Sequence, residues 1–179
     1  MKSIENLIHL ESSASTNTYA FELAESGAGH GTVVWTDEQT SGRGQFDRTW
    51  VSEKGKDLLF SIILRPKISP KDAPQLTVKV AEILKQIFSN YFEVSDDVLT
   101  IKEPNDILLK NKKVCGILTE SSSRGEKLDF VIIGIGVNIN SSPSQHLPEA
   151  TSFLEYAGKE FKLEPLLQLI VSTVIGKLS

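Results

Sequence analysis

The pattern of apolar and polar positions divides the chain into short strands and three helices. Apolar residues recur at helical spacing over 76–88 and again over 163–178, which predicts two amphipathic helices. A shorter helix is predicted over 17–26, with Tyr19 and Leu23 facing the core and Ala20 and Ala24 as further candidates for the same face. A helix bundle is not expected, because the segments between these helices have the composition of strands.

Runs of β-branched, aromatic or alternating apolar residues predict the strands. These runs lie at 7–10, 32–36, 58–64, 98–102, 107–109, 114–118 and 130–139. The polar tip 110–113 between two of them indicates a β-hairpin. The mixed order of strands and helices predicts an α/β (α+β) fold, in which one mixed sheet is packed with helices within a single domain over 1–179.

Composition narrows the classes of function. A net charge of −4 argues against a nucleic-acid-binding domain, which is usually basic, so we expect no DNA partner. The single cysteine, Cys115, excludes an intrachain disulfide, and its apolar surroundings predict a buried small side chain. No apolar stretch is long enough for a membrane span, and 1–10 has no signal segment. We therefore expect a cytoplasmic protein without a membrane partner.

The long polar segment 37–57 is the first candidate for chemistry, because a compact domain rarely keeps such a loop without a use for it. Its centre, Gly42–Trp50, has two glycines around Arg43, which let the backbone approach a ligand closely. Arg43 and Arg48 carry planar charged groups that suit phosphate or carboxylate oxygens. Taken alone, the segment is slightly more typical of a solvated surface loop.

Two further segments follow or begin strands. In Lys102–Asp106, a lysine at a rigid strand end would direct a positive charge into a cleft, while Asn105 and Asp106 suit polar ligand groups or a hydrated magnesium ion. Ordinary turn chemistry explains the same spacing equally well. In Lys113–Glu120, the lysine begins a strand and the glutamate is interpreted as an edge charge.

Glycines also interrupt the long apolar strand at Gly134 and Gly136. Glycine within a strand usually marks a bulge or the close approach of another backbone or a ligand, although tight strand packing is the favoured interpretation when this motif is taken alone. The pattern is not a dinucleotide fingerprint, because no helix begins at these glycines.

Taken in order, these segments resemble the biotin protein ligase family. The matching motifs are Ser15-Thr16-Asn17, Asp37 to Gly44 with Trp50, Lys102-Glu103-Pro104-Asn105-Asp106, Lys113 to Glu120, Gly134 to Asn138, and Thr151-Ser152. The likeness covers nearly the whole chain. Three positions depart from the family pattern: Gln45 stands where arginine is common, Asp47 where glycine is common, and Glu103 where tryptophan is usual. We expect Glu103 to face away from the cleft.

The resemblance implies a fold shared with lipoate ligases and a two-step reaction. Biotin and ATP would form biotinyl-5′-AMP with Mg²⁺, and biotin would pass to a lysine of a biotin carboxyl carrier protein. Lys102, with Arg43, would be catalytic and lie between the biotin carboxylate and the α-phosphate. The implied biotin-binding residues are Ser15, Thr16, Asn17, Gln39, Gly42, Arg43, Gly44, Lys102, Gly116 and Ile117. The implied ATP-binding residues are Arg43, Gln45, Arg48, Trp50, Asn105, Asp106, Lys113 and Asn138, with Asp106 also a candidate metal ligand.

Two alternative functions remain open besides that of a biotin protein ligase. A lipoate ligase or octanoyl transferase would have the same fold, and a biotin- or adenylate-binding domain with impaired catalysis would keep the pocket. The resemblance also allows a homodimer. From the sequence we expect neither the family's N-terminal helix-turn-helix nor its small C-terminal β-barrel.

Overall fold

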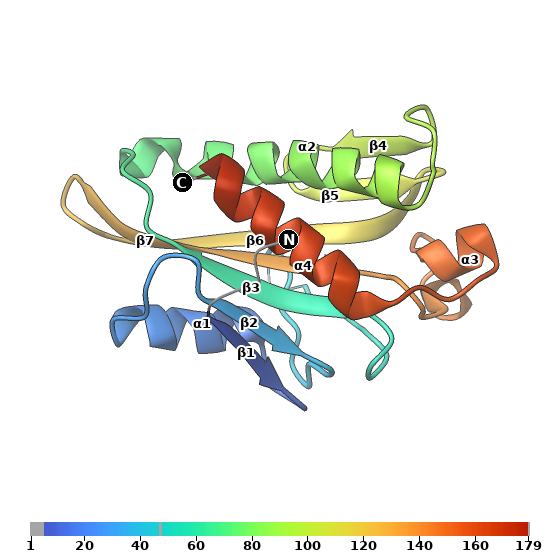
Figure 1. Ribbon diagram of the computed structural model, residues 1–179, viewed down its shortest axis with the longest axis horizontal. Coiled ribbons are helices and arrows are strands. Elements are labelled where there is room, and N and C mark those ends of the chain that lie inside the picture. Colours follow the sequence, from blue (N-terminus) through green and yellow to red (C-terminus); the bar gives the residue numbers. More distant parts are fainter. Residues whose placement is uncertain (1–5, 47, 179) are drawn as a thin grey trace.

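The computed structural model describes residues 6–46 and 48–178, and these form one seven-stranded sheet covered by helices (Figure 1). The strands run in the order β1-β2-β3-β7-β6-β5-β4. Their bounds are β1 Leu7–Leu10, β2 Val33–Thr36, β3 Leu58–Leu64, β4 Leu99–Lys102, β5 Asp106–Leu109, β6 Lys112–Arg124 and β7 Lys127–Val137. The β1–β2 pair is parallel and the other pairs are antiparallel, so the predicted single mixed sheet is confirmed.

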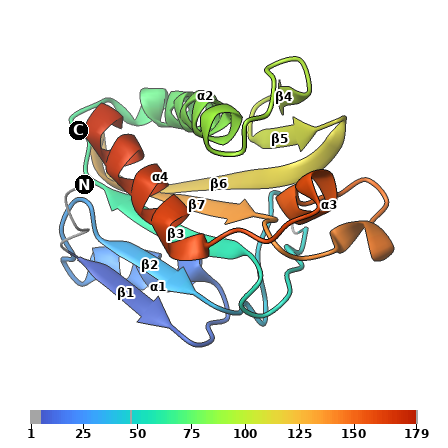
Figure 2. The ribbon, with the colours of Figure 1, turned by 45° about the vertical axis from the view of Figure 1, so that its right-hand side comes forward.

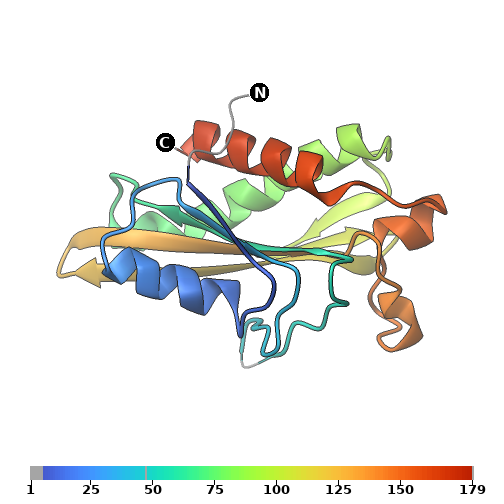
Figure 3. The same cartoon turned by 60° about the horizontal axis from the view of Figure 1, so that its bottom comes forward.

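The helices lie on both faces of this sheet (Figures 1 and 3). Their bounds are α1 Thr16–Glu25, α2 Ala73–Tyr91, α3 Phe153–Ala157 and α4 Leu163–Leu178, with short 3-10 helices η1 Pro70–Asp72 and η2 Pro143–Gln145. Helix α2 packs on β4, β5 and β6, and α4 crosses β3 beside it (Figure 2). Helix α1 covers β2, β3 and β7 from the opposite face. The three predicted helices are therefore confirmed.

Helix α3 was not predicted, because five residues are too few to show a helical period. Local capping sets its bounds instead. The Ser152 hydroxyl accepts from the Glu155 backbone N–H, and the Glu155 carboxylate accepts from the Ser152 N–H. The fully buried Phe153 ring stacks on Phe92, with ring centroids 3.5 Å apart, and so fastens α3 to the end of α2.

Helix α1 packs on the sheet through small side chains, which include the predicted Ala20 and Ala24. Its buried positions are the small or polar residues Thr16, Asn17, Ala20 and Ala24. The prediction that Tyr19 faces the core is wrong, since 37% of this residue is exposed. Because small side chains face the strands, the polar N-terminal turn of α1 reaches the sheet surface directly.

A stabilising substitution is available on the exposed side of α4. Gly176 is exposed, lies within the helix, and has no atom within 4 Å of the position a Cβ would occupy. Gly176→Ala should therefore raise the free energy of unfolding by about 0.5–1 kcal/mol, because alanine loses less backbone entropy in a helix. Urea denaturation of both proteins checks this, and an unchanged or lower midpoint would contradict it.

Candidate functional site

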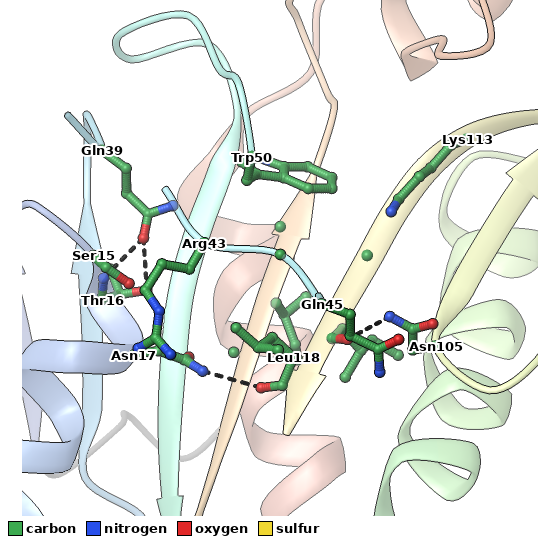
Figure 4. Close-up of a pocket in the computed structure, with 16 residues that line it drawn as sticks. Ser15, Thr16, Asn17, Gln39, Arg43, Gln45, Trp50, Asn105, Lys113 and Leu118 are labelled. Carbon is green, nitrogen blue, oxygen red and sulfur yellow. Dashed lines mark hydrogen bonds between the residues drawn. The ribbon is translucent and has the colours of Figure 1, made fainter. Parts of the chain in front are cut away.

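An elongated pocket lies on the α1 face of the sheet, beneath the loop that joins β2 to β3 (Figure 4). Gln39 and Thr16 lie at one end, Asn105 and Lys113 at the other, and the Trp50 ring lies between them. The pocket is lined by Ser15, Thr16, Asn17, Gln39, Arg43, Gly44, Gln45, Trp50, Asn105, Lys113, Gly116, Ile117, Leu118, Gly134, Ile135 and Gly136. Twelve of these had been predicted as site residues from the sequence.

Three glycines make the floor of the pocket. A Cβ on Gly134 would lie 2.0 Å from Asn17 Oδ1, and one on Gly136 would lie 2.6 Å from the Trp50 ring. Gly116, opposite Gly136 in the β6–β7 ladder, would place a Cβ 2.8 Å from the same ring. The absence of side chains thus lets an amide and an indole lie directly on the strands, which is the close approach that glycine within a strand indicates.

A chain of hydrogen bonds organises the end of the pocket next to α1. The Thr16 backbone N–H donates to Gln39 Oε1 over 2.8 Å, and the Thr16 hydroxyl lies 3.2 Å from the same oxygen. The fully buried Ser61 hydroxyl lies 2.8 Å from Thr16 Oγ1 and 2.7 Å from Asn17 Oδ1. Because the Gln39 carbonyl oxygen is engaged in this way, its Nε2 group remains as a donor beside Gly42.

The same chain continues to the loop through Glu120. Asn17 Nδ2 donates to the Leu118 carbonyl over 3.1 Å and to Glu120 Oε2 over 2.8 Å. Arg43 Nη2 lies 2.7 Å from Glu120 Oε1 in an ion pair. Glu120 lies at a local edge of the sheet, as interpreted from the sequence, because β5 pairs with β6 only as far as Gly116 and Glu120 pairs only with Ile132 of β7. Its carboxylate is nevertheless held by Asn17 and Arg43.

The other end of the pocket is cationic. Lys113 Nζ lies 2.7 Å from Asp106 Oδ1 and 5.4 Å from the centroid of the Trp50 ring. A β-bulge brings this lysine to the pocket face, since the register between β5 and β6 pairs Ile107 with Cys115 but Leu108 with Lys113. Simple alternation from Gly116 would have placed Lys113 on the α2 face, so the bulge redirects its side chain.

Lys102, predicted to be the central lysine, lies outside this pocket. It pairs with Asp106, and Asp106 pairs with Gly116, so all three share one face of the sheet. Lys102 on β4 is two strands away from Gly116 on β6, and neighbouring strands are roughly 5 Å apart. Lys102 is consequently exposed on the edge strand and does not line the pocket, and Glu103 is exposed in the following turn.

The remaining predicted residues are distributed around the site. Gly42 is buried against the Trp50 carbonyl, and Arg48 is exposed in an open hollow beneath the loop. Asn138, predicted near adenine, is buried outside the pocket and donates to the Thr151 carbonyl over 3.0 Å, which holds the segment before α3. Asp47 falls outside the described residues.

Sequence reasoning left several residues out of the site. Gly134 and Gly136 had been noticed as close-approach glycines but not assigned to a ligand site. Ser61 carried no signal, because a single hydroxyl inside the apolar strand β3 is unremarkable. Leu118 and Ile135 line the pocket through their positions on β6 and β7 and read as ordinary core residues.

The described part of the chain offers no preformed metal cage. No three His, Cys, Asp or Glu side chains come together within it, and Asp106, the predicted metal ligand, is bound by Lys113. Cys115 is fully buried, as predicted, and burial raises the pKa of its thiol. None of the helices within 6–46 and 48–178 has the length and apolar character required to span a membrane.

The carboxyl group of Asp57, directly before β3, is buried. Asp57 is 1% exposed, and its Oδ1 accepts from the Ile139 backbone N–H over 2.8 Å. Burial raises the pKa of Asp57 to about 6, although hydrogen bonds from Ile139 and Ser141 oppose the shift. The folded chain therefore holds this proton more tightly than the unfolded chain, where an aspartate pKa is about 3.9.

This pKa predicts that Asp57 makes stability depend on pH. Its contribution is fully present below about pH 4 and is lost as pH rises through 6, because ionisation disfavours the folded state. Relative to Asp57→Asn, the free energy of unfolding of the native sequence should fall by about 2 kcal/mol between pH 4 and pH 7.5. Urea titrations at both pH values measure the difference, and a constant difference would contradict the prediction.

Known proteins with similar sequences identify the family of this chain. A family model described as the biotin/lipoate A/B protein ligase family matches residues 10–138. The chain is 39% identical to the bifunctional ligase/repressor BirA of Bacillus subtilis over 171 residues, covering 93% of this chain and 52% of that protein. It is 38% identical to a biotin–[acetyl-CoA-carboxylase] ligase of Paracoccus denitrificans over 129 residues, covering 72% and 52% respectively. The chain spans about half the length of the curated relatives it matches.

Solved structures with the same architecture include ligand complexes. The biotin protein ligase of Aquifex aeolicus in complex with biotin and ATP superposes with a TM-score of 0.80 and 30% identity, covering 97% of this chain and 70% of that one. The Leishmania major biotin protein ligase in complex with biotinyl-5-AMP gives a TM-score of 0.80 and 27% identity, covering 97% and 75%.

Proposed function

The chain belongs to the biotin/lipoate A/B protein ligase family, and we propose that it uses ATP to activate biotin and transfers the biotinyl group to a lysine of a biotin carboxyl carrier protein. The observation that carries this proposal is the polarity of the pocket, which has amide and hydroxyl groups at one end and a lysine at the other. Biotin has the same arrangement, with a ureido ring at one end and a carboxylate at the other.

The end of the pocket next to α1 suits the ureido ring. Gln39 Nε2 is a donor for the ring carbonyl, because the Gln39 oxygen already accepts from Thr16. Ser15 and Asn17 line the same end. A dithiolane ring would leave such polar groups without partners, at a cost that discriminates strongly between substrates. This end therefore favours biotin over lipoate.

The opposite end suits the reacting groups, and we assign to Lys113 the role that the sequence had suggested for Lys102. A biotin carboxylate oxygen would attack the α-phosphorus of ATP, the bond to pyrophosphate would break, and a mixed anhydride with AMP would form. Both reactants are anions, so a fixed positive charge between them lowers the barrier. Lys113 is the lysine that lines the pocket, and Asp106 and Trp50 hold its side chain.

The second step would be attack of a neutral lysine amine from the carrier on the anhydride carbonyl, with AMP leaving. Acetyl-CoA carboxylase appears in the name of the Paracoccus relative, which supports a carrier of this kind. Arg43, Gly44 and Trp50 from the connection between β2 and β3 line the pocket together with the glycine floor, and they would keep water from the anhydride between the steps.

Movement of this loop is required for substrate entry. The pocket has a free volume of about 50 Å³, whereas pockets for small ligands usually measure roughly 300–1,000 Å³. The hydrogen bonds from Gly44 N to the Arg48 carbonyl and from Trp50 N to the Gly42 carbonyl are internal to the loop. The loop can therefore lift as a unit without breaking the sheet.

Magnesium would accompany ATP in such a reaction. The described residues supply no set of three carboxylate, imidazole or thiolate ligands, and Asp106 is engaged by Lys113. These residues do not fit a protein-held metal centre.

Isotope exchange between pyrophosphate and ATP tests the proposal. Exchange should require biotin and should not occur with lipoate, and radiolabelled biotin should then appear on a purified biotin carboxyl carrier domain. Exchange with lipoate alone would overturn the choice of substrate. Biotin-dependent exchange without labelling of the carrier would leave an adenylate-forming domain that does not complete the transfer.

A further inference from the structure

We propose that Glu120 is a positioning residue for the biotin site, which fixes Arg43 and Asn17 and keeps the Arg43 guanidinium away from the nucleotide phosphates. This inference rests on the proposed function, because it assigns the pocket end next to α1 to biotin. It also changes the role of Arg43, which the sequence had suggested as a second catalytic cation.

The contacts of Glu120 join three separate parts of the chain. Its Oε1 lies 2.7 Å from Arg43 Nη2 in the loop, and its Oε2 accepts from Asn17 Nδ2 in α1 over 2.8 Å. Arg43 Nη1 also donates to Thr18 Oγ1 over 3.3 Å. The guanidinium is thus directed toward α1 and β6, while Lys113 occupies the other end of the pocket.

Glu120 also determines the direction of the hydrogen bonds beyond it. An ionised carboxylate only accepts, so Asn17 must present its NH₂ group to Glu120 and its carbonyl oxygen to Ser61. Ser61 contacts Thr16, which contacts Gln39. This chain of hydrogen bonds therefore begins at Gln39 and ends at Arg43, both in the connection between β2 and β3, and it runs across the α1 face of the sheet between them.

Charge balance within the pocket supports the same assignment. Each of the two pocket cations has its own carboxylate, Glu120 for Arg43 and Asp106 for Lys113. An arginine in a close, two-point contact with a carboxylate has little attraction left for a phosphate. Arg43 is therefore a brace between the loop and the sheet.

The two roles of Arg43 predict opposite results for Glu120→Gln. If Arg43 is a brace, the variant should raise the KM for biotin about tenfold, as expected when a charged hydrogen bond is lost, with kcat and the KM for ATP nearly unchanged. Arg43→Gln should reproduce this pattern. If Arg43 binds phosphate, Glu120→Gln should free it and lower the KM for ATP, while Arg43→Gln should raise that KM.

Asp129→Asn is the matched control. Asp129 on β7 forms an ion pair with Arg124 on β6 at 2.9 Å, and its side-chain exposure of 22% is close to the 25% of Glu120. It lies outside the pocket. Asp129→Asn should leave both KM values unchanged, so a shift common to both variants would indicate a general effect of losing an ion pair and would overturn the proposal.

Amide hydrogen exchange without substrates gives a readout that does not depend on activity. Glu120→Gln should speed exchange at Ser41 and Gly44 several-fold, whereas Asp129→Asn should not. Unchanged exchange at both positions, or a lowered KM for ATP, would overturn the role of Glu120. If the native chain shows no biotin-dependent pyrophosphate exchange, the proposed function fails, and this measurement still decides whether Glu120 holds the loop.

Discussion

Lys113→Ala is expected to lower the rate of biotin-dependent ATP–pyrophosphate exchange by about two to three orders of magnitude, the usual loss when one group that stabilises developing charge is removed. Lys113 is the lysine that lines the pocket, and the β5–β6 bulge directs it there. Its ammonium lies between Asp106 and the Trp50 ring and is held in place before substrates bind. Little reorganisation is then needed when the carboxylate and phosphate meet.

Two other lysines serve as comparisons for this variant. Lys112 is the neighbouring exposed residue at the start of β6, so Lys112→Ala controls for the loss of one positive charge from the hairpin. Lys102→Ala decides between the sequence-based and structure-based assignments. We expect a change of less than about threefold for each, because exposed charges interact weakly through water. A larger loss in Lys102→Ala than in Lys113→Ala would return the central role to Lys102.

The sequence predicts the local structure around Lys102 but not which of the two lysines, Lys102 or Lys113, lies in the pocket. A lysine at the end of a strand before Pro-Asn-Asp has a clear local signature, and its predicted strand is present as β4. The sequence does not reveal that β4 is an edge strand, two strands away from the glycine floor. The sequence also does not reveal the β-bulge between β5 and β6. The bulge leaves one residue of β6 without a partner on β5, and this does not change the apolar pattern of 114–118.

Elements with strong periodicity were predictable for simple physical reasons. Strand β3 is buried along its whole length between helices on both faces, so its sequence is apolar at every position except Ser61, with the predicted bounds. Helix α2 buries one face only, and its apolar positions repeat accordingly. Residues that act through polar contacts, such as Ser61 and Glu120, give no periodic signal. Their roles depend on partners more than forty residues away in the chain.

The glycine floor connects the sequence pattern with the site most directly, and Gly134 is its most constrained position. A Cβ there would lie 2.0 Å from Asn17 Oδ1 and 2.7 Å from Asn17 Cγ. Both the strand backbone and α1 are packed, so the side chain of Asn17 has to move. It would then lose its bonds to Leu118, Glu120 and Ser61 together.

Gly134→Ala should therefore destabilise the fold by about 1–3 kcal/mol, the usual cost of inserting a methyl group into a packed site. It should also raise the KM for biotin more than about tenfold, because buried polar groups of the pocket lose their partners. Gly29→Ala is the control, since Gly29 is exposed and has no atom within 4 Å of its Cβ position. Urea denaturation and biotin-dependent pyrophosphate exchange measure the two effects at a temperature where both variants are folded. A Gly134→Ala protein that matches the control in both would show that Asn17 does not need to lie on the bare strand, and the polar chain from Gln39 to Arg43 would lose its role in holding biotin.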